Sequence, residues 1–439
     1  MILAKGVLRP TEDQNAILEG LEEELAQVLQ RPVPPAETVI AACDALAGRL
    51  LEGEFDGLLA ALGLEERFSK EQVRSAAALM RRDSLEYKLE QELGRDFTAP
   101  RRLEPPHAGL SFTRQVLPLG VLFHIAAGNV DGLPAYSVVE GLLTGNVNIL
   151  KLPQADQGLS VLLLKALVDQ APELSPYVWV FDTPSDDLPA MERMAELSDG
   201  IVVWGGEGAV SAIRRLAPQG SKLIEWGHRL SFAYVTAGGR DPEALAALAR
   251  HILTTRQLLC SSCQTIFLDT GDREEVLDFC RSFLPVLEAA AREAPPLDPG
   301  SAAQVTLALY TRTLEEAAHS DGRRLLRGEG CSLTACADGE LELSWQFGNP
   351  LVKPLPREKL FSMLRRHKGV LQTAGLLCAP EEREELSLLL LRAGVVRVTG
   401  PGEMSRSTCG DAHDGEHPLR RYTRITERSP AFGRAPGGR

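Results

Sequence analysis

The sequence of 439 residues is long enough for two or three domains of about 150 residues each. Hydrophobic residues make up 44% of the chain and charged residues 24%, with 39 glycines and 28 prolines. This composition excludes collagen-like, intrinsically disordered and small disulfide-stapled proteins. The formal net charge of −13 disfavours non-specific electrostatic binding to nucleic acid or anionic lipid. An aromatic content of 5% disfavours binding of single-stranded nucleic acid by base stacking.

No stretch approaches the ~18 apolar residues that a membrane span requires, and the amino-terminal segment has no apolar run after a basic one. We therefore expect a soluble cytoplasmic protein with no membrane span and no nucleic-acid partner. Its eight cysteines are expected to be reduced thiols rather than disulfides.

Helical periodicity dominates residues 1–97, where apolar residues recur at helical spacing between positions 13 and 95. Pro32, Pro34 and Pro35 separate the first two predicted helices. Residues 98–112 hold three prolines and little periodicity, which predicts an extended arm or linker.

Between residues 113 and 236, short apolar runs rich in β-branched residues alternate with helical stretches. Parallel sheets covered by helices on both faces have this pattern, so we predict a doubly wound α/β domain. The predicted strands are 120–125, 147–151, 178–181, 200–204, 222–225 and 232–235, and the predicted helices are 135–143, 159–169, 188–197, 208–215 and 241–254.

A second α/β run is predicted for residues 237–350. Its predicted strands are 265–269, 303–310 and 341–344, and its clearest helix is 273–291. The last residues, 426–439, are rich in glycine, proline and arginine and predict a disordered tail.

Two predicted strands of the first domain lead into a polar side chain. The strand at 121–125 runs into a turn of small residues that carries Asn129, and the strand at 147–151 ends in Lys151. Ligands of open α/β sheets bind at such strand ends, where an amide can donate to an oxyanion and an ammonium can reach a ribose or phosphate. The alternatives are an asparagine in a left-handed turn and a solvated strand end.

Gly205 and Gly206 stand between a predicted strand and a helix, where small residues let backbone N–H groups approach a phosphate. A plain tight turn gives the same pattern. Glu225 ends the strand 222–225 and is a candidate base or water-positioning residue, with an exposed carboxylate as the alternative.

Cys260 stands in the sequence RQLLCSSCQ, between a predicted helix and the strand 265–269. An exposed thiol near backbone dipoles is a nucleophile. The alternatives are a buried structural thiol, a redox pair with Cys263 and half of a zinc site. A second cysteine pair of zinc spacing is missing, and although residues 409–417 have a metal-like composition, we predict no metal site.

Taken in order, these segments resemble the aldehyde dehydrogenase superfamily and, within it, the acyl-CoA reductases of the bacterial luminescence type. The resemblance runs from about residue 114 to about residue 358, and more faintly to residue 425. It is carried by 118–121 (PLGV), Gly128-Asn129, Lys151-Leu152-Pro153, Gly205-Gly206, Glu225-Trp226-Gly227, 257–264 and Phe347-Gly348-Asn349-Pro350.

The resemblance implies an aldehyde dehydrogenase-like fold with a Rossmann-type cofactor domain at 113–236 and a catalytic domain at 237–350. Residues 351–425 would return to the cofactor domain, with the helical lead-in packed on it. Residues 98–112 would be the arm through which family members form dimers or tetramers, so we expect a homo-oligomer.

The same resemblance implies roles for single residues. Cys260 would take the acyl group as a thioester, with Asn129 and the Cys260 backbone N–H forming the oxyanion hole. Lys151 would contact the adenosine ribose. Gly205 and Gly206 would cover the pyrophosphate, and Gly227 is placed with them among the cofactor-binding residues.

Three departures from the family pattern bear on function. Cys263 stands where the reductase branch commonly has proline. His228 and Arg229 replace the Gly-Lys that closes the glutamate motif in the oxidising branch, which weakens the hydrolytic role of Glu225. Gln154 stands where NAD-preferring members carry a glutamate, and a neutral side chain does not repel a 2′-phosphate, so we expect NADPH, with NADH as the alternative.

The implied activity is reduction of an acyl-CoA, or of an acyl group on a carrier protein, to the aldehyde through an acyl-cysteine. An acyl-transferring protein is a candidate partner. One alternative is an aldehyde dehydrogenase that oxidises an aldehyde to acid or acyl-CoA. Another is a scaffold without activity, against which the presence of Asn129 and Cys260 argues.

Overall fold

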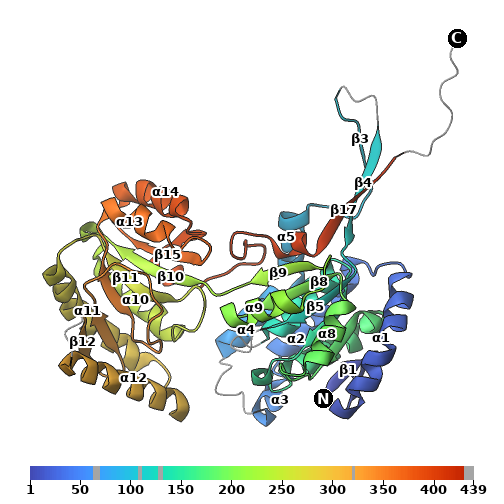
Figure 1. Cartoon of the computed structure of the whole chain (residues 1–439), viewed down its shortest axis with the longest axis horizontal. Helices are drawn as coiled ribbons and strands as arrows, with labels where there is room; N and C mark the ends of the chain where they lie inside the picture. The colour runs from blue at the N-terminus through green and yellow to red at the C-terminus, as the bar shows by residue number, and fades with distance from the viewer. Residues whose placement is uncertain (63–69, 107–110, 127–131, 319–321, 430–439) are drawn as a thin grey trace. The chain divides into compact units, whose positions relative to one another are not determined.

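The computed structural model describes residues 1–62, 70–106, 111–126, 132–318 and 322–429. The chain forms two compact units, the first made of Met1–Gly227 with Thr408–Arg439 and the second of His228–Ser407. Each unit contains a seven-stranded sheet with helices on its faces (Figure 1). None of the helices in the described ranges is both long and apolar enough to cross a membrane.

The sheet of the first unit has the order β2-β1-β7-β6-β5-β8-β9. Its parallel strands match the predicted ones; they are β5 (Val121–Ile125), β6 (Val147–Lys151), β7 (Val178–Phe181), β8 (Gly200–Trp204) and β9 (Lys222–Trp226). An antiparallel edge, β1 (Ile2–Ala4) and β2 (Val7–Arg9), was not predicted, because strands of three residues are too short to show an alternating pattern.

In chain order, the parallel strands of this sheet run 3-2-1-4-5, which is the Rossmann order. The predicted α/β fold class is therefore confirmed. The strand order reverses between β5 and β8, the position at which doubly wound sheets bind their ligands. The accompanying helices are α6 (Leu133–Leu143), α7 (Leu159–Gln170), α8 (Leu188–Glu196) and α9 (Glu207–Leu216).

The predicted helical lead-in packs on this sheet. In α1, the residues Leu18, Leu21, Leu25 and Val28 recur every three or four positions and are buried in the same apolar cluster as the strands. Helix α2 starts after the three prolines, as predicted. The lead-in helices are α1 (Gln14–Leu29), α2 (Ala36–Leu51), α3 (Asp56–Ala61), α4 (Lys70–Leu79) and α5 (Arg82–Leu93).

The predicted arm is part of a separate three-stranded antiparallel sheet, which extends from the first unit (Figure 1). Its order is β17-β4-β3, with β3 at Arg101–Leu103, β4 at Phe112–Pro118 and β17 at Thr423–Arg428, after the short helix α15 (Pro418–Arg421). The prediction of a disordered tail from residue 426 was wrong for Thr426–Arg428, because their backbone pairs with β4. Residues 430–439 lie outside the described residues, and the homo-oligomer stays a prediction.

The sheet of the second unit has the order β12-β13-β14-β11-β10-β15-β16 and is parallel apart from β12. Its strands are β10 (Leu230–Val235), β11 (Cys263–Leu268), β12 (Arg324–Arg327), β13 (Ser332–Ala335), β14 (Leu351–Pro354), β15 (Leu371–Leu377) and β16 (Arg397–Thr399). Its helices are α10 (Pro242–Thr254), α11 (Arg273–Glu293), α12 (Pro299–Ala318), α13 (Arg357–Arg365) and α14 (Arg383–Ala393).

The predicted domain limits differ from these units at two places. Strand β10 was assigned to the first domain but is central in the second sheet, because an apolar strand pattern does not reveal which sheet the strand joins. The return to the first unit begins at Thr408 rather than at residue 351, since β14, β15 and β16 all pair in the second sheet.

Two predicted strands of the second domain were wrong. Residues 303–310 lie inside the helix α12, whose start is capped by Asp298: its Oδ1 accepts hydrogen bonds from the N–H groups of Gly300 and Ser301 at 3.0 Å. Residues 341–344 form no strand and are held by side chains instead, as when Thr265 Oγ1 donates to the carbonyl oxygen of Glu342 at 3.1 Å.

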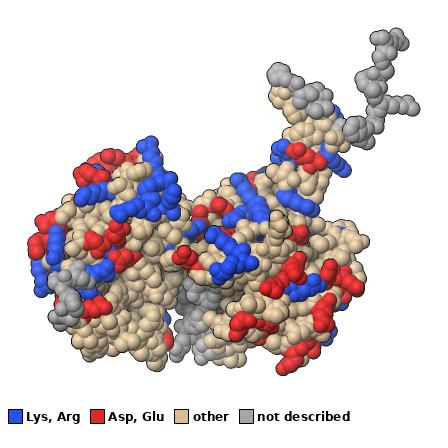
Figure 2. Space-filling view, in the orientation of Figure 1, with Lys and Arg blue, Asp and Glu red and all other residues tan. Residues whose placement is uncertain are grey.

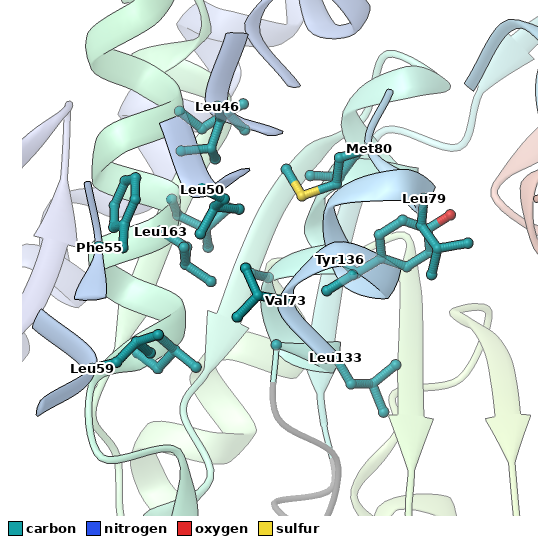
Figure 3. Close-up of a pocket in the computed structure, with 17 residues that line it drawn as sticks. Leu46, Leu50, Phe55, Leu59, Val73, Leu79, Met80, Leu133, Tyr136 and Leu163 are labelled. Atoms are coloured by element: carbon teal, nitrogen blue, oxygen red, sulfur yellow. The ribbon is translucent and has the colours of Figure 1, made fainter. Parts of the chain in front are cut away.

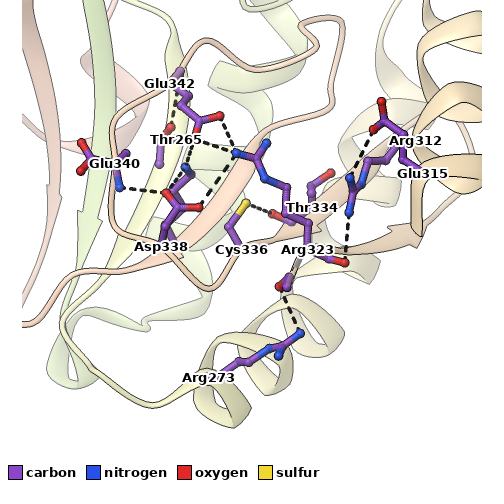
Figure 4. Close-up of polar contacts among 12 residues, drawn as sticks. Thr265, Arg273, Arg312, Glu315, Arg323, Thr334, Cys336, Asp338, Glu340 and Glu342 are labelled. Atoms are coloured by element: carbon purple, nitrogen blue, oxygen red, sulfur yellow. Dashed lines mark hydrogen bonds and ion pairs between the residues drawn. The ribbon is translucent and has the colours of Figure 1, made fainter. Parts of the chain in front are cut away.

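The segment before β14 is fixed by a buried charge. Lys353 is fully buried, and its Nζ lies 2.7 Å from an Asp338 oxygen and 2.6 Å from a Glu342 oxygen. Arg323 adds a second positive charge 2.8 Å from Glu342 (Figure 4). Two cations thus face two carboxylates, which compensates the cost of burying the Lys353 ammonium.

Surface charges are of both signs on each unit in the face of Figure 2. Several form exposed ion pairs, including Arg193 with Glu22 and Arg114 with Glu427. Such pairs contribute about 0–1 kcal/mol each, so the fold depends mainly on its apolar cores.

His124 in β5 connects three elements of the first unit. The ring is completely buried, with Nδ1 2.8 Å from Ser137 Oγ of α6 and Nε2 3.0 Å from Asn148 Oδ1 of β6. Burial lowers the pKa of His124 to about 4. The neutral ring therefore holds β5, α6 and β6 together.

We predict that His124 makes the first unit sensitive to acid. The pKa of His124 in the folded protein lies below the ordinary value of ~6.5, so the neutral ring contributes fully to the free energy of unfolding above pH 6.5. This contribution decreases by at most about 3 kcal/mol as the pH falls towards 4. Chemical unfolding of the wild type and of His124→Gln at several pH values measures this. The difference in unfolding free energy between the two should change over that range; parallel profiles would contradict the assignment.

Candidate functional site

A cleft of about 460 Å³ lies at the carboxyl ends of β5, β6 and β8, where the strand order of the first sheet reverses. It brings together Lys151, Gln154 and Gly205, three residues singled out from the sequence. The rest of its lining consists of Ile125, Ala126, Pro153, Ser185, Asp186, Trp204 and Ala209. The position and the lining both suit a nucleotide.

Lys151 is the last residue of β6, and its ammonium is held inside the cleft. The residue is 5% exposed, and its Nζ donates a hydrogen bond to Ser185 Oγ at 2.8 Å. Burial lowers the pKa of Lys151, against the opposing effect of the Asp182 carboxylate. Because an ammonium has three N–H donors and Ser185 accepts one, the group can also donate to ligand hydroxyls.

Gly205 and Gly206 join β8 to α9. Gly206 is the N-cap of α9 and has no side chain with which to cap the first N–H groups of the helix. A Cβ added at Gly205 would lie 3.1 Å from the Ala209 Cβ, so a larger residue would crowd the start of the helix. These residues therefore fit a phosphate of a dinucleotide at the N-terminus of α9.

Glu225 and Gly227 lie on β9 and just after it, and neither is among the described residues that line the cleft. The Arg214 guanidinium of α9 donates to both oxygens of the Glu225 carboxylate, which is 24% exposed. The carboxylate is thus engaged in an ion pair.

Asn129 lies in residues 127–131, outside the described residues, together with Gly128. Its role as an oxyanion donor stays a prediction. The described residues on either side are Ala126, which lines the cleft, and Gly132, which precedes α6.

Cys260 lies in the turn between α10 and β11 of the second unit, and its side chain is exposed. The backbone of this turn is held on both sides of the thiol. Ser231 Oγ of β10 donates to the Cys260 carbonyl oxygen at 2.7 Å, and the Ser261 hydroxyl lies 2.7 Å from that of Ser405. The Leu259 N–H donates to Ser262 Oγ at 3.1 Å.

Gln257 connects this turn to a distant segment, a role that the sequence did not reveal. It is completely buried with a left-handed φ of 59°. Its Nε2 donates to the Cys263 carbonyl oxygen at 2.7 Å and to Ser344 Oγ at 3.0 Å, and its Oε1 accepts from the N–H groups of Gly348 and Asn349 at 3.1 and 2.9 Å. Both donors and both acceptor positions of the amide are therefore used.

Gln264 completes the same network. Its Nε2 donates to the Gln257 carbonyl oxygen at 2.8 Å, while its Oε1 accepts from Ser344 Oγ at 2.7 Å. In the sequence, the feature that could have indicated this network is that Gln257 and Gln264 flank the two cysteines. Their partners lie some 80 to 90 residues further along, too far for a local pattern to indicate them.

The other seven cysteines differ from Cys260. Burial raises the pKa of each, to about 12 for Cys263, whose Sγ lies 3.5 Å from the Thr265 carbonyl oxygen. A thiol of that pKa is protonated at neutral pH and is a poor nucleophile. The remaining six are Cys43, Cys280, Cys331, Cys336, Cys378 and Cys409.

His251 of α10 supports the turn from inside. Its Nε2 accepts a hydrogen bond from the Cys263 N–H at 3.3 Å, and burial lowers the pKa of His251 to about 4. The ring is therefore neutral at physiological pH and can accept this bond.

The segment at 409–417 packs within the first unit. The His413 ring lies 4.9 Å, centroid to centroid, from those of Trp204 and Trp226. Cys409 Sγ is 3.9 Å from the Tyr136 hydroxyl. No group of three or more His, Cys, Asp or Glu side chains that could hold a metal occurs among the residues the structure describes.

The family of the chain follows from comparison with known proteins. The model of the acyl-CoA reductase (LuxC) family matches residues 34–425. The chain belongs to this family. It is 25% identical over 324 residues to long-chain acyl-protein thioester reductase 2 of Photobacterium leiognathi and 23% identical over 321 residues to the long-chain acyl-protein thioester reductase of Vibrio harveyi.

These alignments cover 70% and 71% of the chain but only 63% and 64% of the two relatives. Among solved structures, the chain resembles the NADP complex of NADP-dependent glyceraldehyde-3-phosphate dehydrogenase from Bacillus halodurans, with a TM-score of 0.71, 17% identity and 98% of each chain covered. It also resembles GapN of Methanocaldococcus jannaschii, with a TM-score of 0.69, 14% identity and 96% and 95% of the two chains covered. The predicted aldehyde dehydrogenase fold is thereby confirmed.

We predict that Cys260 is the most reactive thiol of the native protein. Because it is exposed and burial raises the pKa of the other seven, iodoacetamide at pH 7.5 should modify it at least ~10-fold faster than any other cysteine. Peptide mass spectrometry at short times measures this, with Cys260→Ser and Cys378→Ser as a matched pair. Equal early labelling of the half-buried Cys378 or Cys409 would contradict the prediction.

Proposed function

We propose that the protein reduces an acyl thioester to the aldehyde through an acyl group on Cys260. The single observation that carries this proposal is the exposed Cys260 in a turn held by Ser231, Gln257 and Ser261. Membership of the acyl-CoA reductase (LuxC) family supports the choice of an acyl substrate. Because two relatives are named long-chain acyl-protein thioester reductases, we propose acyl-protein thioesters as donors beside acyl-CoA.

In the first half-reaction, the Cys260 thiolate attacks the thioester carbonyl carbon. The bond to the donor sulfur breaks, and the donor leaves as a thiol after taking a proton. One thioester replaces another, so this step is nearly balanced in energy. Asn129 and the Cys260 N–H are the proposed donors to the developing oxyanion.

A bound nicotinamide supplies the hydride for the second half-reaction. Hydride addition to the acyl carbon gives a thiohemiacetal on Cys260, whose oxygen keeps the negative charge until the carbon–sulfur bond breaks. The aldehyde then leaves, and Cys260 is again a thiolate. The proposed role of Lys151, Gly205, Gly206 and Gly227 is to bind the cofactor.

The ion pair of Glu225 favours reduction over hydrolysis. A glutamate that activates water needs an oxygen able to accept the proton, whereas Arg214 engages both Glu225 oxygens. With little water activation, the acyl-enzyme persists until hydride arrives. We therefore propose that acid release, the product of the oxidising alternative, is a minor reaction.

The cofactor preference depends on charges of opposite sign in the cleft. The Lys151 ammonium attracts a 2′-phosphate and the neutral Gln154 does not repel it, whereas the Asp186 carboxylate in the same lining does. We propose NADPH as the preferred cofactor and the Gln154 side chain as the determinant of this preference. A substitution of Gln154 can therefore reverse the preference.

We expect aldehyde formation from acyl-CoA and NADPH to depend on Cys260. Cys260→Ser should lower kcat by at least ~10³-fold because the hydroxyl is a poor nucleophile without a base, whereas Cys263→Ser should keep activity within a few-fold. The test is nicotinamide absorbance with chromatography of the product, using wild-type, Cys260→Ser and Cys263→Ser proteins. Full activity of Cys260→Ser, or acid as the main product, would refute the proposal.

We expect Gln154→Glu to shift the preference towards NADH. A carboxylate repels the 2′-phosphate and can accept a hydrogen bond from the ribose hydroxyl, so the ratio of kcat/KM for NADPH to that for NADH should fall by about tenfold or more. Ala155→Glu, a neighbouring exposed site outside the described cleft lining, is the control. An unchanged ratio in Gln154→Glu would remove Gln154 as the determinant.

A further inference from the structure

The turn that carries Cys260 lies at the edge of the second sheet where its parallel strands begin. Cys260 stands just before β11, and its carbonyl oxygen accepts a hydrogen bond from Ser231 Oγ of β10 at 2.7 Å. The same Oγ accepts a hydrogen bond from the Thr373 N–H of β15 at 3.0 Å, and Thr373 pairs with Arg397 of β16. One sheet edge therefore contains the thiol together with the first residues of β10, β15 and β16.

Two arginines at this edge are connected to the same turn. The hydroxyl of Ser405 lies 2.7 Å from that of Ser261, and Arg406 follows Ser405 in the chain. The Arg397 guanidinium donates a hydrogen bond to the Arg406 carbonyl oxygen. Arg406 Nη1 lies 3.2 Å from a Glu403 oxygen, but the two side chains are 72% and 60% exposed. Such an exposed ion pair contributes little stability, so the Arg406 guanidinium can exchange this partner for a ligand.

The charge at this edge is predominantly positive. The edge is formed by the described segments 228–229, 255–262, 366–369, 397 and 403–407. The cations of these segments are Arg229, Arg256, Arg366, Lys368, Arg397 and Arg406. The only carboxylate in the same described segments is Glu403, while Glu340, outside them, pairs with Arg366 at 3.0 Å. A negatively charged substrate that approaches the thiol along this edge therefore meets net positive charge.

Helix termini explain only part of this charge. The helix dipole favours cations near a helix C-terminus, which accounts for those at 366–369, after α13. Arg229, Arg397 and Arg406 lie outside the helices. The Arg229 guanidinium donates to the Gly369 carbonyl oxygen and so lies at the turn before β15. These three arginines are thus placed at the edge without a helix that requires them.

The dimensions of the edge match those of an acyl-CoA. In the strand order β11-β10-β15-β16, Arg397 lies three strand spacings of ~4.8 Å from β11, or about 14 Å. The pantetheine arm of CoA separates the thioester from the phosphates and is about as long as four or five extended residues, on the order of 15 Å. With the thioester at Cys260, the phosphates therefore reach the position of Arg397 and Arg406.

We propose that Arg397 and Arg406 bind the phosphates of the CoA part of an acyl-CoA, with Arg229 adding positive charge beside them. The inference rests on the proposed thioester reduction at Cys260. Guanidinium groups suit this role because their planar N–H donors match the oxygens of a phosphate. The two arginines thus determine donor specificity and take no part in the acyl transfer itself. A donor without these phosphates, such as an acyl group on a protein cysteine, makes no use of them.

The test compares octanoyl-CoA with octanoyl-pantetheine, which has the same thioester and arm but no phosphate. Arg406→Gln should lower the ratio of kcat/KM for octanoyl-CoA to that for octanoyl-pantetheine at least ~5-fold, mainly through KM, because a contact made in the ground state and the transition state alike is lost. Adding Arg397→Gln should lower the ratio at least ~20-fold, and Arg406→Lys should restore part of the loss caused by Arg406→Gln. The wild-type ratio should also fall with added KCl, which screens exposed charges.

Arg281→Gln is the matched control. Arg281 of α11 forms an exposed ion pair with Asp278, three residues away, at the same spacing as the pair of Arg406. This variant should leave the ratio unchanged. An unaltered ratio in Arg406→Gln, or an equal loss for both thioesters, would overturn the phosphate site. Continued reduction of octanoyl-pantetheine would in that case leave the reductase proposal standing.

A binding measurement separates the phosphate site from the chemistry. Free CoA should bind to Cys260→Ser protein in a calorimetric titration, with NADP⁺ at saturation to occupy the cofactor cleft. Its affinity should fall at least ~5-fold when Arg406→Gln is added and should not change with Arg281→Gln. If no thioester is reduced but this pattern holds, the reductase proposal fails and the phosphate site stands. CoA binding that is absent or independent of Arg406 would count against the site itself.

Discussion

The candidate catalytic turn depends on the buried amide of Gln257. Four hydrogen bonds from one side chain connect the Cys260–Cys263 turn to Ser344, Gly348 and Asn349. A buried amide left without partners is costly, so the turn and the 344–349 segment have to keep this arrangement together. An exposed thiol is thereby fixed on a rigid backbone, which is what a nucleophile that must meet a substrate in one geometry requires.

In the first unit, a polar cleft and an apolar cavity are lined by residues on opposite sides of residues 127–131 in the sequence. The cleft before these residues is lined by an ammonium, a carboxylate and a glycine that precedes a helix N-terminus, whereas the cavity after them, among α2, α3, α4, α6 and α7 (Figure 3), is lined by aliphatic and aromatic side chains. Buried His124 holds β5, α6 and β6 together at this place.

The sequence predicted the parts of this arrangement that follow local patterns. Strands such as Val178–Phe181 are covered on both faces and form continuous apolar runs, and Lys151 and Gly205 could be placed together because parallel strands end at one edge. The pattern failed at 303–310, where a capped helix carries exposed apolar residues, including Leu307 at 70% exposure. It also could not indicate the partners of Gln257 or the pairing of Glu225 with Arg214, which depend on contacts across the fold.

The central claim is that Cys260 carries the acyl group. The most direct measurement is to incubate the protein with octanoyl-CoA without nicotinamide and to analyse the tryptic peptide of residues 257–273, which contains Cys260 and Cys263. The account predicts an added octanoyl group on Cys260, which disappears on addition of NADPH with release of octanal. Acylation of Cys263 or of another residue, or no acylation of a protein that still reduces the thioester, would contradict it.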